Sequence, residues 1–288
     1  WQVELPLDPG AVSALGYKRR GEGWYYITFE LPENPIENAR LVFDGVLGQS
    51  VVYVNGTVAV RNFSGYNRFT CEIGSYLLPG EENMIAMYVD ASVWEGWWYE
   101  GAGIYRHVWL EKTGAVHLAH WPVYVTTPQI SEDSATVEIR TRVSNTSSKD
   151  CEVKIVQSVG SAKAESKKIK LKAGQEREVV QMLSIRNPKL WSCESPNLYE
   201  LNTKLVSGET EIDSHKTSFG VRSIEWTKDG FYLNGERVQL KGVCEHHDLG
   251  PLGAAFHARG YERKIEILKE MGCNSIRMTH NPPAPEVL

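Results

Sequence analysis

Two short segments near the end of the sequence hold the side chains best suited to bind a polar ligand. Residues 242–248 read G-V-C-E-H-H-D, and residues 274–283 read N-S-I-R-M-T-H-N-P-P. His246 and His280 can donate or accept a hydrogen bond with a hydroxyl group, and Arg277 carries a rigid set of donors that can hold a carboxylate. These residue types favour hydrogen bonding to a polar ligand.

A metal site is the chemical alternative, because His246, His247 and Asp248 are all metal-ligand types. A structural zinc site needs four ligands, and a catalytic one needs about three with defined partners around them. Adjacent side chains of an extended strand point to opposite faces, so His246 and His247 rarely bind one ion. We therefore expect no metal and no cofactor. Taken alone, the histidines also fit ordinary surface residues, and Arg277 with His280 fits a structural role.

The elements around these residues follow a strand–helix–strand pattern. Tyr261, Ile265 and Leu268 are spaced i, i+4 and i+7, which predicts one apolar helix face, and Gly272 can end that helix. Residues 274–278 predict a short strand that the following Pro-Pro pair stops. This is the pattern of an α/β unit. In a β/α barrel the strand ends carry the active site, which is where the Arg and His side chains fall.

Everything before residue 220 is typical of short strands and turns. Residues 24–31 are aromatic and β-branched, and two strand-like runs flank Asn55–Gly56, a two-residue hairpin signal. Many short strands of this kind predict a β-sandwich or jelly roll. Residues 136–143 then alternate apolar and charged side chains, which indicates a second antiparallel sandwich of immunoglobulin-like type. A further hairpin is predicted at Asn234–Gly235.

The composition places the chain among ordinary globular proteins. Its 288 residues are enough for two or three domains, with 42% hydrophobic and 23% charged residues. The formal net charge of −5 and the lack of a basic stripe argue against nucleic acid, and no apolar run approaches the ~20 residues that span a bilayer. The lysines of residues 167–172 favour a solvated strand edge over a binding site. The five cysteines are scattered, with no C-x-x-C pair, which argues against a disulfide framework: Cys71, Cys151, Cys193, Cys244 and Cys273.

Five segments together resemble glycoside hydrolase family 2. Residues 274–283 resemble the family's first signature, and residues 242–248 resemble its first barrel strand, where G-V-N-R-H-E is the commoner form; Cys244 and Glu245 depart from it. The others are G-A-G-I-Y-R-H-V-W-L at 101–110, L-W-S-C-E-S-P-N-L-Y at 190–199 and F-G-V-R at 219–222. The resemblance covers the whole chain.

The resemblance implies a mainly β, multidomain fold. It predicts a sugar-binding-like jelly roll at residues 1–113, an immunoglobulin-like β-sandwich at 114–219, and the incomplete start of a (β/α)8 TIM barrel at 220–288. The implied activity is that of a retaining exo-glycosidase acting on terminal β-galactosides. Its acid/base and nucleophile glutamates are expected beyond Leu288, so that these residues alone are inactive. The alternatives are a β-glucuronidase, a β-mannosidase or a non-catalytic carbohydrate-binding module.

The resemblance also implies roles for individual residues. Arg277 is expected to position the nucleophile carboxylate. Four residues are expected to bind the substrate sugar: His246, His280, Asn281 and Asp248. An aromatic cluster is expected to stack on sugar or, equally, to pack between domains: Trp94, Trp97, Trp98 and Tyr99.

The partner is expected to be a carbohydrate substrate, with a family-type ion site and a homo-oligomer left open. A periplasmic or secreted location follows if a signal peptide was removed, and a cytoplasmic one otherwise.

Overall fold

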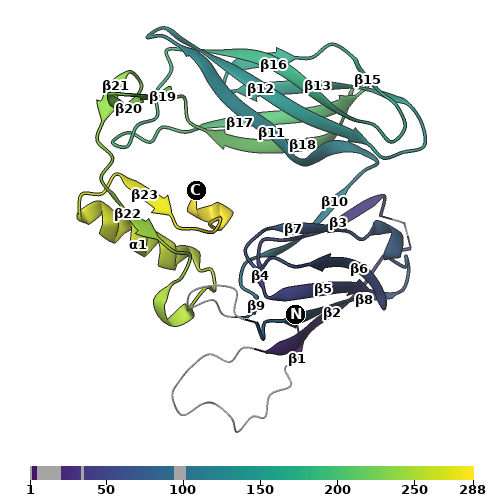
Figure 1. Cartoon of the computed structure of the whole chain (residues 1–288). Helices are drawn as coiled ribbons and strands as arrows, with labels where there is room; N and C mark the ends of the chain where they lie inside the picture. The colour runs from purple at the N-terminus through teal and green to yellow at the C-terminus, as the bar shows by residue number, and fades with distance from the viewer. Residues whose placement is uncertain (1, 5–20, 34–35, 94–101) are drawn as a thin grey trace. The chain divides into compact units, whose positions relative to one another are not determined.

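The computed structural model describes residues 2–4, 21–33, 36–93 and 102–288 (Figure 1). Strands dominate these ranges, which confirms the mainly β expectation. The chain divides into two compact units, one made of Trp1–Lys112 with Lys241–Leu288 and the other of Thr113–Leu240. None of the helices in the described ranges is long and apolar enough to cross a membrane.

The first part of unit one is an antiparallel β-sandwich. Its larger sheet has the order β1 (Gln2–Glu4), β2 (Glu22–Glu30), β8 (Glu82–Asp90), β5 (Gln49–Val54) and β6 (Thr57–Asn62). The facing sheet has the order β10 (Val108–Thr113), β3 (Asn38–Phe43) and β7 (Phe69–Glu72), and β4 (Val46–Leu47) pairs with β9 (Gly103–Ile104).

Alternation along the strands of this sandwich builds its core. In β8 the side chains of Ile85, Met87 and Val89 are buried, and those between them are more exposed, because successive residues of a strand face opposite sides. They pack with Phe43 and Val52 from β3 and β5 in one apolar cluster. The predicted hairpin is confirmed between β5 and β6.

The β5–β6 turn shows why Asn-Gly was a usable signal. Asn55 has φ +49° and Gly56 has φ +80°, the pair of left-handed conformations that a type I′ turn requires. Asn55 also donates from its amide to Asn83, which fixes the turn against β8.

Unit two is built around a second antiparallel sandwich. One sheet has the order β11 (Val116–Ile130), β12 (Ser134–Asn145) and β16 (Glu176–Arg186). The other has the order β14 (Ala162–Glu165), β13 (Cys151–Val159), β17 (Tyr199–Ser207) and β18 (Thr210–Phe219), and β15 (Ile169–Leu171) also pairs with β13. The alternation predicted for residues 136–143 is confirmed, because Val137, Ile139, Thr141 and Val143 are fully buried.

A polar layer crosses the interior of this second sandwich. Thr141, Gln157 and Thr203 are buried, and Gln157 donates from Nε2 to Thr141 Oγ1 at 2.9 Å. Each interrupts an inward-facing apolar run, and the apolar core on either side forms two separate clusters. Gln181 interrupts the inward-facing side of β16 in the same way.

A three-stranded antiparallel sheet completes unit two, made of β19 (Ile224–Thr227), β20 (Gly230–Leu233) and β21 (Glu236–Val238). Asn234 and Gly235, both at positive φ, form the predicted turn between β20 and β21.

The second part of unit one has the predicted strand–helix–strand order. Strands β22 (Gly242–Glu245) and β23 (Ser275–Met278) are parallel, and helix α1 (Ala258–Glu270) joins them (Figure 1). Tyr261 and Leu268 are the buried residues of α1, as their spacing predicted. Gly272 follows the helix with φ +85°, a conformation in which glycine carries no Cβ penalty.

Candidate functional site

The two chemically distinctive segments lie side by side because β22 and β23 form a parallel pair. Cys244 is the register partner of Arg277, and Glu245 is the partner of Met278. The backbone N–H of Thr279 then donates to the carbonyl of Glu245 at 2.8 Å. His246 and His280 therefore follow their strands at the same, carboxyl-terminal edge, where parallel strands present ligand-binding loops.

The two histidines expected to bind a sugar meet at this edge. The rings of His246 and His280 lie 5.8 Å apart, centroid to centroid, and cross at 79°. His246 is half-buried, His280 is exposed, and the peptide bond between Thr279 and His280 is cis. His247 turns elsewhere and contacts Tyr66 and Tyr105, with ring centroids 5.8 and 5.9 Å away. The expectation that the adjacent histidines diverge is confirmed.

Arg277 lies exposed on β23 and points its guanidinium across to β22. Its Nη1 lies 3.6 Å from Cys244 Sγ and 3.5 Å from Thr279 Oγ1. Hydrogen bonds from Arg277 and Thr279 lower the pKa of the exposed Cys244 thiol, with a smaller opposing effect of desolvation. The cysteine that departs from the commoner family segment is thus the residue that Arg277 contacts.

Helix α1 fixes the loop after β22 through Lys264. The Lys264 ammonium forms an ion pair with Glu245 and donates to the backbone carbonyl of Asp248 at 3.1 Å. Both ionic side chains are less than a third exposed, at 29% for Lys264 and 18% for Glu245. Asp248 itself is half-buried. One lysine therefore positions the chain on both sides of His246 and His247.

Arg106 fixes the loop after β23 from the sandwich side of unit one. It is 7% exposed and donates from Nη2 to the carbonyl of Pro282 at 2.6 Å. Its Nη1 lies 3.4 Å from the carbonyls of both Pro283 and Asp44. The G-A-G-I-Y-R segment and the T-H-N-P-P segment, distant in sequence, are consequently joined at this loop.

The remaining predicted site residues are placed as follows. Asn281 is half-buried between His280 and the Pro-Pro pair. The aromatic cluster of Trp94, Trp97, Trp98 and Tyr99 lies outside the described residues. The roles of all these residues in binding stay predictions. Sequence reasoning did not find Lys264 or assign Arg106, although Arg106 belongs to a segment that the resemblance had already marked.

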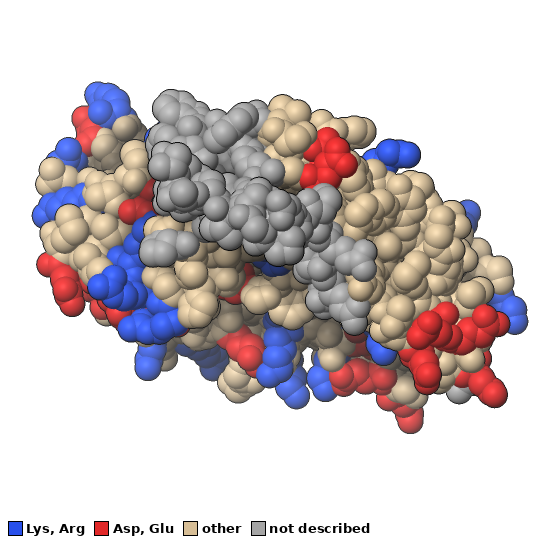
Figure 2. All heavy atoms as spheres, turned by 90° about the horizontal axis from the view of Figure 1, so that it is seen from below, with Lys and Arg blue, Asp and Glu red and all other residues tan. Residues whose placement is uncertain are grey.

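Two other features of the described part of the chain concern its metal-ligand side chains and the mixed charge on one of its faces. No group of three or more His, Cys, Asp or Glu side chains there could hold a metal ion. Over the face shown in Figure 2, Lys and Arg side chains lie among Asp and Glu side chains.

Comparison with known families matches nearly the whole chain. The profile described as "Glycosyl hydrolases family 2, sugar binding domain" matches residues 6–114. "Glycosyl hydrolases family 2" matches residues 116–222, and "Glycosyl hydrolases family 2, TIM barrel domain" matches residues 224–288. These matches occur in the order that the sequence predicted, and they confirm the fold class of a sugar-binding β-domain, an immunoglobulin-like sandwich and the start of a TIM barrel.

Individual relatives carry two kinds of activity in their names. Beta-galactosidase BoGH2A of Bacteroides ovatus is 41% identical over 277 residues, covering 93% of this chain and 32% of that protein. The crystal structure of a glycosyl hydrolase family 2 member from Bacteroides cellulosilyticus has a TM-score of 0.89 at 34% identity, covering 93% of this chain and 38% of that one.

A beta-glucuronidase structure from Bacteroides uniformis has a TM-score of 0.82 at 28% identity, covering 93% of this chain and 34% of that one. The chain therefore spans about a third of the length of these relatives.

Proposed function

Because the chain belongs to glycosyl hydrolase family 2, we propose that it forms part of a retaining exo-glycosidase and supplies one wall of that enzyme's sugar site. The observation that carries the proposal is the meeting of His246, His280 and Arg277 at the carboxyl edge of two parallel strands. The same proposal divides the chain into a sugar-binding-like domain at residues 1–113, an immunoglobulin-like sandwich at 114–219 and the start of the barrel at 220–288.

In this proposal the two histidines bind sugar hydroxyls. Imidazole nitrogens can donate to or accept from a hydroxyl, and two rings crossing at 79° present those nitrogens in different directions. Lys264 supports the loop that carries His246, and Arg106 supports the loop that carries His280. Because both loops are already fixed, they lose less conformational entropy when a sugar binds, which favours binding.

Arg277 would position a carboxylate brought from another part of the enzyme. A retaining glycosidase uses two carboxyl groups about 5–5.5 Å apart, one as acid/base and one as nucleophile. In this proposal both carboxyl groups come from other strands of the barrel, and no glutamate of residues 242–288 is assigned either role. The exposed guanidinium of Arg277 contacts Cys244 and Thr279 through Nη1 alone, which leaves donors for such a partner.

We favour terminal β-galactosides as substrates. The T-H-N-P-P sequence and the aromatic run of residues 94–106 resemble the β-galactosidase branch of the family. The name of the Bacteroides ovatus relative agrees with this preference, whereas the Bacteroides uniformis relative favours a β-glucuronide. A β-glucuronidase also needs groups that receive the sugar's carboxylate, which gives the two alternatives different chemistry.

Aryl glycosides separate these alternatives in the full-length protein that carries these residues. We expect kcat/KM for an aryl β-galactoside to exceed that for the matching β-glucuronide and β-mannoside. Arg277→Lys should lower kcat by about 10²-fold, because a displaced nucleophile reacts poorly. The matched control Arg263→Lys, on the exposed face of α1, should leave kcat unchanged.

Two results would count against the proposal. A higher kcat/KM for the β-glucuronide would contradict the proposed substrate, while the protein would still be a glycosidase. Saturable galactose binding without hydrolysis of any of the three glycosides would instead indicate a carbohydrate-binding module. A homo-oligomer stays a prediction that light scattering of the same sample checks.

A further inference from the structure

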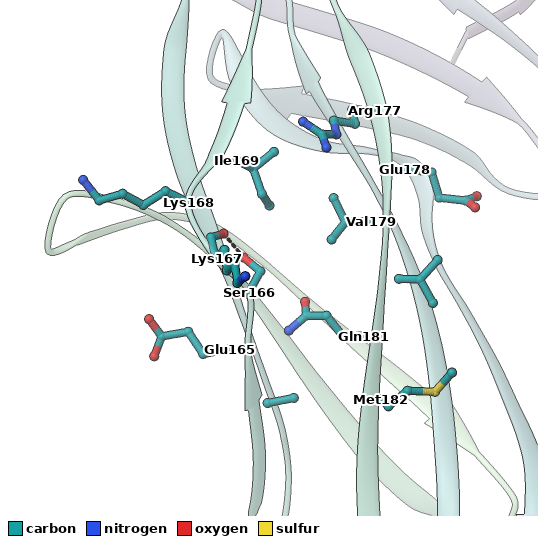
Figure 3. Close-up of a pocket in the computed structure, with 12 residues that line it drawn as sticks. Glu165, Ser166, Lys167, Lys168, Ile169, Arg177, Glu178, Val179, Gln181 and Met182 are labelled. Carbon is teal, nitrogen blue, oxygen red and sulfur yellow. Dashed lines mark hydrogen bonds between the residues drawn. The ribbon is translucent and has the colours of Figure 1, made fainter.

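A groove opens at the side of the unit-two sandwich, between the edges of its two sheets. Residues 164–169, from β14 to the start of β15, line one wall, and residues 177–182 of β16 line the other (Figure 3). The groove has a volume of about 490 Å³. Pockets that hold small ligands fall in the range of about 300–1,000 Å³, so the groove has room for a sugar.

Gln181 lies at the inner end of this groove with an amide that lacks hydrogen-bond partners. The residue is 9% exposed, and neither its Nε2 nor its Oε1 has a partner among the described residues. Figure 3 shows its amide between the two walls, with the nitrogen toward the side of Ser166 and Glu165. Burying an amide without partners costs about 1–3 kcal/mol per group, so a native protein normally satisfies it with water or a ligand.

A third orphaned amide atom lies on β13, the strand that pairs with β14 of the groove wall. Gln157 Oε1 is buried and without a partner among the described residues. Gln157 is the register partner of Ala164, which lines the groove. Gln157 therefore lies beside a residue of the groove wall, although it does not itself line the groove.

The mouth of the groove carries an excess of positive charge. Three of its charged side chains have opposite charges close by: Glu165 with Lys154 at 2.6 Å, Lys168 with Glu152 at 2.7 Å, and Glu178 with Arg140 at 3.8 Å.

Lys167 and Arg177 also line the groove, and neither has a carboxylate within 4.0 Å among the described residues. Figure 3 shows the Arg177 guanidinium turned toward Ile169 on the opposite wall.

We propose that this groove is a binding site for an acidic saccharide of the uronate type, separate from the glycosidase site. The carboxylate of the sugar would bind Arg177 and Lys167 at the mouth. A ring hydroxyl would accept from Gln181 Nε2, and another would donate to Gln181 Oε1. A neutral sugar would leave the two cations unmatched, and a bare anion would leave Gln181 Oε1 without a donor, since an ionised oxyanion only accepts.

Isothermal titration of the 288-residue chain with sodium glucuronate tests this site. Glucose serves as the neutral counterpart and sodium sulfate as the bare anion. We expect saturable binding of glucuronate, weakened about fivefold or more in Arg177→Gln and in Lys167→Gln. The matched control Arg186→Gln, exposed on the same strand β16, should bind as the parent chain does.

Gln181→Leu tests the inner end of the groove. Binding should weaken about tenfold, because two hydrogen bonds to the sugar are lost. The unfolding temperature should stay the same or rise, because the orphaned amide is gone. If Gln181→Leu does not fold, Lys167→Gln carries the test, since that side chain is exposed.

A further variant distinguishes binding in the groove from binding at the proposed glycosidase site. His280→Ala, in the other unit, should leave glucuronate binding in the groove unchanged. Equal affinity for glucose or for sulfate would overturn the proposal. So would binding of glucuronate that Arg177→Gln, Lys167→Gln and Gln181→Leu leave unaltered, or the lack of any saturable binding.

Discussion

Arg106 donates from its buried guanidinium to the carbonyl oxygen of Pro282 at 2.6 Å, although the two residues are 176 positions apart. Three backbone carbonyls surround this one side chain, two from the loop after β23 and one from Asp44 of the sandwich. Arginine suits this place because its planar fork supplies several donors in fixed directions. The sandwich of unit one is therefore part of the support for the loop that carries His280.

Loss of Arg106 should loosen that loop. In Arg106→Ala the carbonyls of Pro282, Pro283 and Asp44 lose a donor whose own side chain is buried, which should lower the free energy of unfolding of unit one by about 2–4 kcal/mol. Amide exchange of residues 279–288 should accelerate. Arg106→Lys should restore only part of the protection, since an ammonium cannot reach all three carbonyls in one plane.

The control for this prediction is Arg61→Ala, because Arg61 is exposed on β6. Equal amide exchange of residues 279–288 in Arg106→Ala and in the parent chain would show that the Pro-Pro pair, and not Arg106, holds the loop.

Local sequence signals predicted the elements of the fold well. Asn55 and Asn234 marked their hairpins because Asn-Gly accepts positive φ at both turn positions. Tyr261 and Leu268 marked the buried face of α1 because helical spacing brings i and i+7 together. In each case the physical cause lies within a few residues of the signal.

The contacts that build the site had no such local cause. Cys244 and Arg277 are 33 positions apart, and their contact depends on the register of a parallel strand pair. From the sequence alone, Lys264 resembles an ordinary exposed helix residue, because its contacts with Glu245 and Asp248 depend on how β22 packs beside α1. Gln181 shares the inward parity of Leu183 and Ile185, and that parity was the one available sign of a buried amide.

The ion pair of Lys264 with Glu245 should stabilise unit one more than the surface pair of Arg259 with Glu266 on the same helix. The first pair is less than a third exposed, whereas Arg259 and Glu266 are 58% and 57% exposed and screened by water. A double-mutant cycle with Lys264→Met and Glu245→Gln should give a coupling energy of about 1 kcal/mol. The cycle with Arg259→Met and Glu266→Gln should give a smaller one.

Both coupling energies come from urea unfolding, and salt provides an independent check. Raising the salt concentration should reduce the Arg259–Glu266 coupling more than the Lys264–Glu245 coupling. Equal couplings for the two pairs would mean that Lys264 acts through its 3.1 Å contact with the Asp248 carbonyl and not through the carboxylate.

Cys71 should make the protein less stable in alkali. Burial, with a smaller contribution from the charge of Glu72, raises the pKa of the Cys71 thiol from its ordinary value of 9.0 to about 11. Between those values the unfolded chain loses the proton and the folded chain keeps it, so unfolding is favoured as pH rises. The loss can reach about 1.4 kcal/mol per pH unit from this group.

Cys71→Val keeps the volume of the side chain and removes the titration. The free energy of unfolding of this variant should therefore fall less steeply between pH 9 and 11 than that of the parent chain. Thr70→Val, exposed on the same strand β7, changes no ionisable group and is the matched control that should keep the parent slope. Identical slopes for all three proteins would show that Cys71 ionises as freely in the folded state as in the unfolded one.

The contact of Arg277 with Cys244 should be measurable as thiol reactivity. Hydrogen bonds from Arg277 and Thr279 lower the pKa of the Cys244 thiol, so the thiolate is populated at a lower pH than usual. Iodoacetamide reacts with the thiolate, with the sulfur displacing iodide, and the pH midpoint of alkylation reports this pKa. Arg277→Ala should move that midpoint upward, because the guanidinium no longer stabilises the negative sulfur.

Two comparisons make this last measurement specific to the pair. Arg263→Ala removes an exposed arginine from α1 and should leave the midpoint of Cys244 alkylation in place. Cys151, whose thiol pKa is raised by burial and by Asp150, should have a higher midpoint than Cys244 in every variant. If Arg277→Ala left the Cys244 midpoint unchanged, the guanidinium would not be held against the sulfur in solution. Arg277 would then have to be positioned for a carboxylate by Thr279 alone, through a contact of 3.5 Å that is too long to fix its direction.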